Sequence, residues 1–198
     1  MERSQQAAAP LLPAIPRRER YGTLGGSALV LLFVFLYVGF WLIWDGHVSG
    51  KEEVRPGTTI AVSDSVSFIP ADGWSLERGA TTPGQRSTVT SGASAFSVST
   101  STWLGTLEEH TAREKKLLRA ASKAHLYGND QSFHTGNGLT GVKFSYFASK
   151  VEGILWIAYD PGTKTVVTLN GQSAQGTLPA AAGQFQEMVD SVRTGAGE

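Results

Sequence analysis

The chain has 198 residues, and its 17 Lys and Arg balance 17 Asp and Glu, so the formal net charge is zero. It contains no cysteine, which excludes disulfides, thiol catalysis, iron–sulfur clusters and cysteine-type zinc sites. A neutral chain gives no electrostatic case for a nucleic-acid partner. Charged residues make up only 17% of the chain, below the roughly 25% of an average domain. This low fraction indicates that the average hides an uncharged segment.

The first twenty residues are rich in proline and alanine and contain few large apolar side chains. Such a composition does not bury a core, so we predict a disordered cytoplasmic tail over residues 1–20. The tail ends in a basic cluster formed by Arg17, Arg18 and Arg20.

An uncharged apolar run covers residues 21–44. About 20 helical residues cross a bilayer core of roughly 30 Å, and a helix satisfies its own backbone groups in lipid. Aromatic side chains near both ends match the belts found at membrane interfaces. The run therefore predicts a transmembrane helix, whose anchoring side chains include Leu29, Phe33, Leu36, Trp41 and Trp44.

The charges around this run predict its orientation. The three arginines stand before it, whereas acidic and basic residues are mixed after it. The positive-inside rule places the N-terminus in the cytoplasm and everything after residue 44 outside. We therefore expect a single-pass protein of the cell membrane with an extracytoplasmic C-terminal domain.

A cleaved signal peptide is the alternative interpretation of this run. Signal peptides have an apolar core of about 7–15 residues, followed by a cleavage site with small residues. The core here is longer, and the best candidate site, at residues 48–50, is poor. An uncleaved anchor is therefore favoured, and the lack of cysteine excludes a lipoprotein anchor.

The rest of the chain divides into a polar juxtamembrane linker over residues 45–57 and one domain over residues 58–194. Alternation of apolar and polar residues predicts strands in the domain. The run over 153–159 is apolar without alternation, which indicates a central strand covered on both faces. The strands are expected at residues 66–70, 88–90, 96–102, 142–148, 153–159 and 164–169.

Two helices are also predicted. The first begins at Thr106, where Glu109 three residues later completes a capping box, and runs to about His125. On its outer side we expect an ion pair between Glu109 and Arg113. The second runs from about Pro179 to Arg193 and has an apolar stripe. Together these elements predict an α+β domain, with an antiparallel sheet covered by helices on both faces in three layers.

Two segments of the domain carry a family resemblance. Residues 66–74 read Val-Ser-Phe-Ile-Pro-Ala-Asp-Gly-Trp, and residues 185–192 read Phe-Gln-Glu-Met-Val-Asp-Ser-Val. They resemble the opening strand and turn, and the closing helix, of PsbP-like domains, and the resemblance covers about 58–194. It implies a non-catalytic assembly or accessory subunit that binds other proteins, here an envelope protein of actinobacterial type. Because the family has no universal catalytic set, no active site is carried over.

The residues that suggest chemistry are few. His110 and Glu114 lie one turn apart and form a possible pair of metal ligands with His134, although an ion pair is the favoured interpretation. There is no Gly-x-Ser-x-Gly elbow, and residues 136–143 lack the adjacent Gly-Lys-Ser/Thr of a phosphate loop. We therefore predict no catalytic residue, cofactor or metal.

The first predicted helix has a basic side. Three of its cations, Lys116, Arg119 and Lys123, fall near one another on it. They form a possible interaction face for anionic lipid headgroups or an acidic partner. A solvated outer face is the alternative interpretation.

These observations predict a non-catalytic, membrane-anchored accessory or assembly subunit, which binds a protein partner in a membrane or cell-envelope complex. One alternative is an extracytoplasmic module that binds a lipid or small ligand in a cleft between sheet and helix. A second is an envelope hydrolase. The chain is rich in alanine, glycine and threonine and poor in lysine, which indicates a bacterium with a GC-rich genome.

Overall fold

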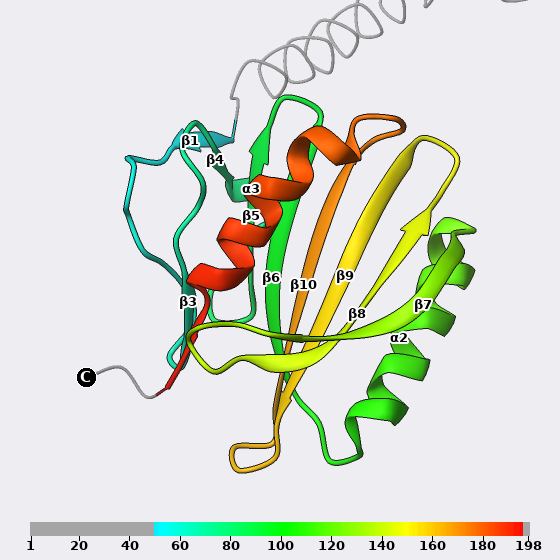
Figure 1. Cartoon of the computed structure of the whole chain (residues 1–198). Helices are drawn as coiled ribbons and strands as arrows, with labels where there is room; N and C mark the ends of the chain where they lie inside the picture. The colour runs from blue at the N-terminus through cyan, green and yellow to red at the C-terminus, as the bar shows by residue number, and fades with distance from the viewer. Residues whose placement is uncertain (1–49, 196–198) are drawn as a thin grey trace, which may run out of the picture. The chain divides into compact units, whose positions relative to one another are not determined.

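The computed structural model describes residues 50–195 of the chain (Figure 1). The predicted tail and membrane span, with the residues assigned to anchoring and orientation, lie outside this range. Among the helices within it, none has the length and apolar character that a membrane crossing requires.

The described residues contain two α-helices, one short 3₁₀ helix and eleven strands. In chain order they are β1 (Lys51–Glu53), β2 (Ile60–Ser63), β3 (Val66–Phe68), β4 (Ser75–Glu77), the 3₁₀ helix η1 (Arg78–Ala80), β5 (Arg86–Ser91), β6 (Ser94–Thr102), α2 (Leu107–Ser122), β7 (His125–His134), β8 (Thr140–Phe147), β9 (Val151–Asp160), β10 (Thr165–Ala174), α3 (Leu178–Ser191) and β11 (Arg193–Thr194).

Eight strands form one antiparallel sheet in the order β1-β4-β5-β6-β10-β9-β8-β7. Three more, in the order β11-β3-β2, form a small second sheet. The longest ladder joins β9 to β10 across the predicted turn at residues 160–163, with Thr165 opposite Asp160 and Ala174 opposite Val151. The ladder of β7 with β8 is interrupted by a bulge between Tyr127 and Gln131, a feature that increases strand twist.

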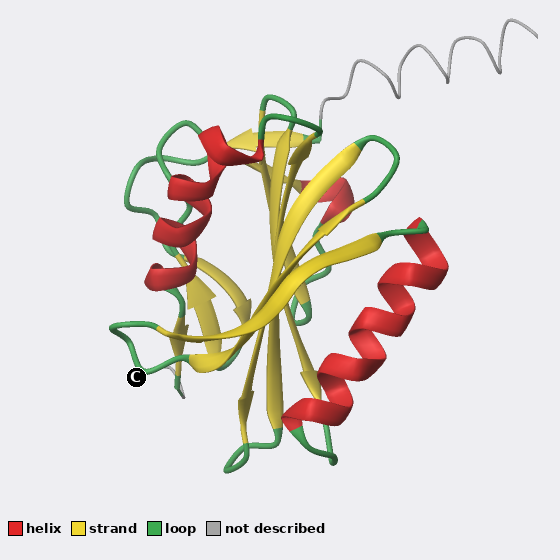
Figure 2. Cartoon of the chain, turned by 45° about the vertical axis from the view of Figure 1, so that its right-hand side comes forward, coloured by secondary structure: helices red, strands yellow, loops and turns green. Residues whose placement is uncertain are grey.

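The two α-helices lie on opposite faces of the large sheet, as Figure 2 shows. Because side chains alternate along a strand, β9 serves both faces. Its Trp156 and Ala158 join the core beneath α3, whereas Leu155 and Ile157 join the core beneath α2. The predicted antiparallel sheet domain with two helices is therefore confirmed, and so is the expectation that the strand at 153–159 is covered on both faces.

The core beneath α3 is built around Phe185. Its ring stacks on Phe96 at a centroid distance of 6.0 Å and meets Trp74 edge-on at 5.8 Å. Trp74 is 1% exposed, and its indole N–H donates to Gln184 at 3.2 Å. A Cβ at Gly171 would lie 2.7 Å from the Phe185 ring, so only glycine lets α3 approach β10 this closely.

The capping box at the start of α2 is confirmed. The Thr106 hydroxyl accepts from the Glu109 N–H at 3.2 Å, and the Glu109 carboxylate accepts from the Thr106 N–H at 2.9 Å. Because this carboxylate turns back to the helix start, the expected ion pair with Arg113 is absent among residues 50–195.

Both helices end earlier than predicted. Lys123 takes a left-handed conformation (φ 51°) and ends α2 at Ser122, so His125 begins a strand instead of closing the helix. His134, named above as a possible metal ligand, is the last residue of β7. Most side chains of β7 are exposed, so the strand lacks the apolar alternation by which strands are recognised.

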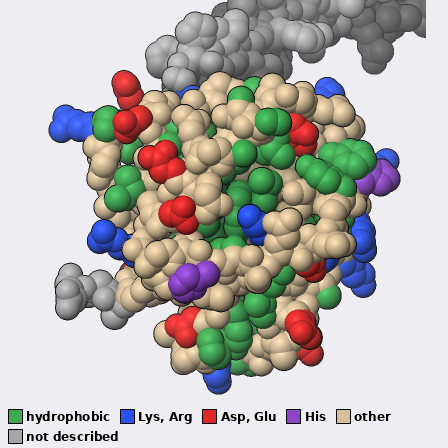
Figure 3. All heavy atoms as spheres, in the orientation of Figure 1, with side chains coloured by type: hydrophobic (Ala, Val, Ile, Leu, Met, Phe, Trp, Pro, Cys, Tyr) green, Lys and Arg blue, Asp and Glu red, His purple; other side chains and the backbone are tan. Residues whose placement is uncertain are grey.

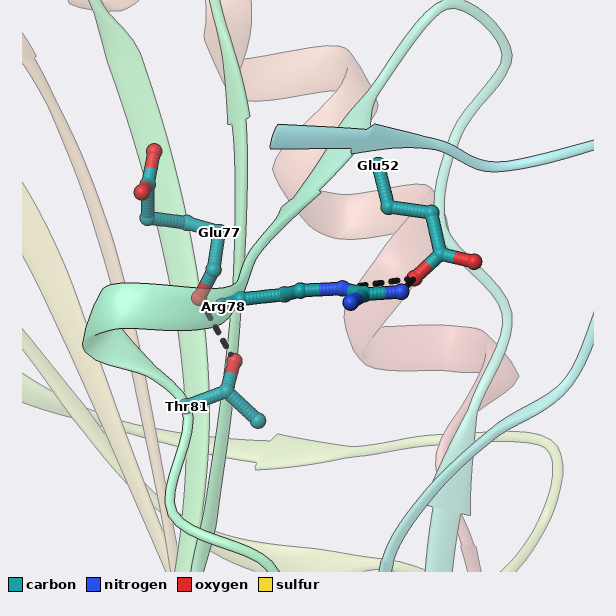
Figure 4. Close-up of polar contacts among 4 residues, drawn as sticks. All are labelled: Glu52, Glu77, Arg78 and Thr81. Carbon is teal, nitrogen blue, oxygen red and sulfur yellow. Dashed lines mark hydrogen bonds and ion pairs between the residues drawn. The ribbon is translucent and has the colours of Figure 1, made fainter. Parts of the chain in front are cut away.

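The part of the predicted linker that the structure describes includes strand β1, which pairs with β4. Its side chains are all exposed, so backbone pairing and polar contacts hold it in place. The Arg78 N–H donates to the Gly50 carbonyl at 2.8 Å, and the Arg78 guanidinium donates to the Glu52 carboxylate at 2.8 and 3.1 Å (Figure 4). Next to this pair, the Thr81 hydroxyl donates to the Glu77 carbonyl at 2.8 Å.

Candidate functional site

Helix α2 covers only part of its face of the sheet. The apolar side chains beneath it come mainly from β8, β9 and β10. The strands β5, β6 and β10 continue this face as a polar surface. Residues directly opposite in a ladder point to the same side, and the register places Ser99 opposite both Arg86 and Thr168, and Ser97 opposite Asn170. This surface is called the hydroxyl face below.

A cleft of about 600 Å³ lies where α2 meets the hydroxyl face. Its floor includes Ser97, Ser99, Thr168 and Asn170. Its helix side is formed by Trp103, His110, Arg113, Glu114 and Leu118. Its opposite side is formed by Thr82, Gln85 and Arg86, which lie at the junction of η1 and β5.

His110 is the buried polar residue of this cleft. Its side chain is 6% exposed, and neither ring nitrogen has a hydrogen-bond partner. The Glu114 carboxylate oxygen nearest to Nε2 is 3.6 Å away, which is beyond hydrogen-bond distance. Leaving a buried polar group unpaired costs about 1–3 kcal/mol. The ring therefore carries unmet hydrogen-bonding capacity at the wall of the cleft.

The surroundings of His110 keep the ring neutral. Burial lowers the pKa of His110, the Glu114 carboxylate opposes this shift, and the Arg113 guanidinium adds to it. A neutral imidazole carries one donor and one acceptor. His110 is therefore suited to a ligand hydroxyl group, which both donates and accepts a hydrogen bond.

Trp103 contacts both His110 and Arg113 at the rim of the cleft. Its indole N–H donates to the Thr106 carbonyl at 3.0 Å, which fixes the ring at the start of α2. The His110 ring meets it edge-on at 5.0 Å, and the Arg113 guanidinium carbon lies 5.4 Å from its centroid. One aromatic side chain thus holds both a neutral and a cationic group at the rim of the cleft.

The floor of the cleft retains hydrogen-bonding capacity. The Ser99 hydroxyl donates to the Thr168 carbonyl at 3.3 Å, and the Asn170 side-chain carbonyl accepts from the Tyr146 hydroxyl at 2.8 Å. Burial raises the pKa of Tyr146, so this hydroxyl remains a donor. Within residues 50–195 the hydroxyls of Ser97 and Thr168 donate to no protein group.

The charges of the cleft favour an acidic ligand. Two guanidinium groups, from Arg86 and Arg113, face one carboxylate, from Glu114, which leaves one net positive charge. Apolar side chains are in the minority among the residues that line the cleft. The arrangement fits a polar molecule that carries hydroxyl groups and an anionic group.

The structure does not bring the possible metal ligands together. His134 lies on β7, where its Nδ1 contacts the Thr140 hydroxyl at 2.9 Å. No group of three His, Asp or Glu side chains within residues 50–195 is placed to hold a metal ion. The alternative of a site formed by His110, Glu114 and His134 is therefore not supported.

The predicted interaction face lies elsewhere on α2. Lys116, Arg119 and Lys123 are exposed and do not line the cleft. Sequence reasoning missed the cleft residues Arg86, Trp103 and Thr168 as a group. One sequence signal pointed toward the cleft: the polar side of residues 96–102 indicates a hydrophilic strand face. That pattern does not show that α2 leaves this face open.

No protein-family model matches the chain, and no curated protein matches it. Solved structures with a similar fold include cyanobacterial PsbP from Synechocystis sp. PCC 6803, with 18% identity and a TM-score of 0.49. That match covers 67% of this chain and 88% of the PsbP chain. A PsbP protein is thus among the similar structures, as the resemblance in residues 66–74 and 185–192 predicts.

Two further solved structures also match the chain. The Ran-binding protein Mog1p of Saccharomyces cerevisiae has 9% identity and a TM-score of 0.48, over 66% of this chain and 90% of its own. LpqN, involved in cell envelope biogenesis of Mycobacterium tuberculosis, has 12% identity and a TM-score of 0.38, over 73% of this chain and 88% of its own.

Proposed function

We propose that residues 58–194 form a non-catalytic binding domain, held outside the cell membrane by the span at 21–44, and that its ligand occupies the cleft beside α2. The observation that carries this proposal is His110, a buried side chain that lines the cleft with both ring nitrogens unpaired. A purely structural histidine at such a position would normally have a hydrogen-bond partner.

The chemistry of the cleft selects among the possible ligands. The hydroxyl face, the two arginines and the neutral imidazole favour a polar ligand with an anionic group. They disfavour the acyl chain of a lipid, which would desolvate these groups without compensating them. Of the two ligand classes expected for a binding module, we therefore propose the small polar ligand.

Native mass spectrometry of the full chain, extracted from its own membrane in mild detergent, tests this proposal. We expect an additional mass from a polar anionic molecule on the wild type, and reduced retention on Arg86→Gln. The matched control is Arg193→Gln, which removes the same charge from β11, outside the cleft. No additional mass on the wild type, or equal retention on the two variants, would overturn the assignment of the cleft.

We further propose that the domain acts as an accessory subunit of a membrane or cell-envelope complex with a protein partner. Crosslinking in the native membrane followed by co-purification tests this part separately. Recovery of the chain only as a lone monomer under several gentle conditions would contradict it. A hydrolytic activity lost on His110→Ala would instead favour the hydrolase alternative.

A further inference from the structure

The outer face of α2 carries positive charge that is not neutralised locally. Lys116, Arg119 and Lys123 are exposed, and no acidic residue occurs in the sequence between Glu114 and Asp130. Asp130 is already paired with Lys115, at 2.6 Å. Within residues 50–195 the three outer cations have no ion-pair partner.

Exposed aromatic side chains adjoin the C-terminal end of this helix. Tyr127 and Phe147 are 44% and 41% exposed, and His125 stacks on Phe147 at 5.1 Å. Arg119 and Lys123 line a shallow hollow together with His125. Figure 3 shows hydrophobic, histidine and basic side chains gathered at the right-hand edge of the molecule. We call this surface the basic–aromatic end; it consists of Arg119, Lys123, His125, Tyr127, Phe147 and Lys150.

The chain enters the domain at the same end of the sheet. Gly50 precedes β1, which pairs with β4 (Figure 1). From β4 onward, residues paired in successive ladders form one row across the sheet. This row consists of Ser75, Thr90, Ala95, Gln172, Gly153, Tyr146 and Leu126. The last two residues of this row adjoin Phe147 and His125 of the basic–aromatic end. Of the acidic residues at this end, Glu52, Glu53 and Glu77 lie at the opposite edge on β1 and β4. Glu152 lies opposite Phe147, and its carboxylate accepts from the N–H groups of Gly176 and Leu178.

The covalent distance to the predicted membrane span is short. Gly50 is the sixth residue after Trp44, where the span is predicted to end. Six residues of fully extended chain reach about 20 Å. In a chain anchored by residues 21–44, this length keeps the β1 edge of the domain near the lipid headgroups. The basic–aromatic end lies across the sheet, seven strand spacings or about 33 Å from β1, and can reach the same headgroups when this end of the sheet faces the membrane.

We propose that the basic–aromatic end docks on anionic lipid headgroups of the membrane that carries the chain. Basic side chains near such a surface are attracted by its negative potential. Tyrosine, phenylalanine and the stems of lysine and arginine place apolar atoms at the boundary of the headgroups. The inference rests on the membrane anchor of the proposed function and is independent of the ligand in the cleft.

The test uses the full chain reconstituted into vesicles of phosphatidylcholine, with or without 30 mol% phosphatidylglycerol (about one anionic lipid in three). Because the chain has no cysteine, Ser149→Cys provides a unique fluorophore site beside Lys150. The control site is Leu104→Cys, 80% exposed in the loop after β6 at the other end of the sheet. A quencher attached to lipid headgroups reports the proximity of each site to the bilayer.

We expect quenching at residue 149 in anionic vesicles, little quenching in neutral ones, and little at residue 104 in either. Arg119→Gln/Lys123→Gln should shift the docking equilibrium by about 30-fold, from two charges at about 1 kcal/mol each. Lys164→Gln/Arg193→Gln removes two charges near the opposite end of the sheet and should leave docking unchanged.

Each other result overturns the inference. Equal quenching at residues 149 and 104, or equal quenching in neutral and anionic vesicles, excludes docking on anionic lipid. Binding of an acidic protein to the same cations, without dependence on anionic lipid, assigns the surface to that protein instead. Loss of the chain from vesicles on an alkaline wash refutes the membrane anchor. Retention without quenching at residue 149 refutes docking alone.

Discussion

Replacing His110 with leucine is expected to stabilise the ligand-free chain, although the residue is buried. The substitution removes two unpaired ring nitrogens from a side chain that is 6% exposed. Relief of an unpaired buried polar group is worth about 1–3 kcal/mol. Loss of the edge-on contact with Trp103, at 5.0 Å, costs about 0.5–1.5 kcal/mol. The expected net gain in the free energy of unfolding is about 1 kcal/mol at pH 7.5.

The gain should grow as the pH falls. Because burial lowers the pKa of His110, the unfolded chain binds more protons than the folded chain just below pH 6.5. The stability of the wild type therefore decreases as the pH falls below this value, by at most about 1.4 kcal/mol per pH unit for one proton. Glu114 and Arg113 act on the same ring in opposite directions and remain in the variant. Leucine removes this contribution to the pH dependence.

Urea unfolding of the full chain in detergent micelles, followed by tryptophan fluorescence at pH 7.5 and 5.5, measures both effects. The same variant should lose the ligand mass retained by the wild type, because the pairing group is gone. A variant that is less stable than the wild type at both pH values would show that His110 is a packing residue. A wild type whose stability rises on acidification through pH 6.5 would refute the pH argument.

Three further predictions concern the elements that frame the cleft and the core. Gly171→Ala should lower the free energy of unfolding by about 1–3 kcal/mol, because its Cβ would lie 2.7 Å from the Phe185 ring; urea midpoints measure this. Gly183→Ala is the control in α3, where a Cβ meets nothing within 4 Å, and should stabilise by about 0.5–1 kcal/mol. Glu152→Ala should cost about 1–2 kcal/mol, because its carboxylate accepts two N–H bonds, at 2.8 and 3.0 Å, at the start of α3; hydrogen exchange at that helix start reports it. Thr106→Ala should cost about 1 kcal/mol and fray the first turn of α2, seen as a loss of helical circular dichroism. An unchanged midpoint for any of the three would contradict the contact on which it rests.

Local signals predicted the starts of both helices well. The capping box at Thr106 lies within one turn, so its partners are visible in the sequence and form as expected. Pro179 lies in the first turn of α3, as its missing N–H favours. The ends were predicted less well, because they depend on distant partners. Helix α3 stops at Ser191, and β11 then pairs with β3, more than a hundred residues earlier.

The candidate site shows the same division. The polar side of β6 was visible in the alternation of Ser97 and Ser99 with Phe96 and Val98. Whether this polar side is open to a ligand depends on which part of the sheet α2 covers, and no local sequence pattern specifies that part. The spacing of His110 and Glu114 placed the two side chains one helical turn apart, as the sequence indicated. The burial of the His110 ring, which packs edge-on against Trp103, depends on tertiary packing.

By itself the sequence determined the class of the fold, the uncharged run over 21–44 and the absence of cysteine chemistry. These properties follow from composition and from periodicity along the chain. Only the tertiary structure decided that α2 covers the apolar part of its sheet face and leaves the polar part open, that His110 is buried without a hydrogen-bond partner, and that His125 stacks on Phe147 beside Lys123. The physical reason is that burial and pairing are properties of contacts between distant segments, which the strand register establishes.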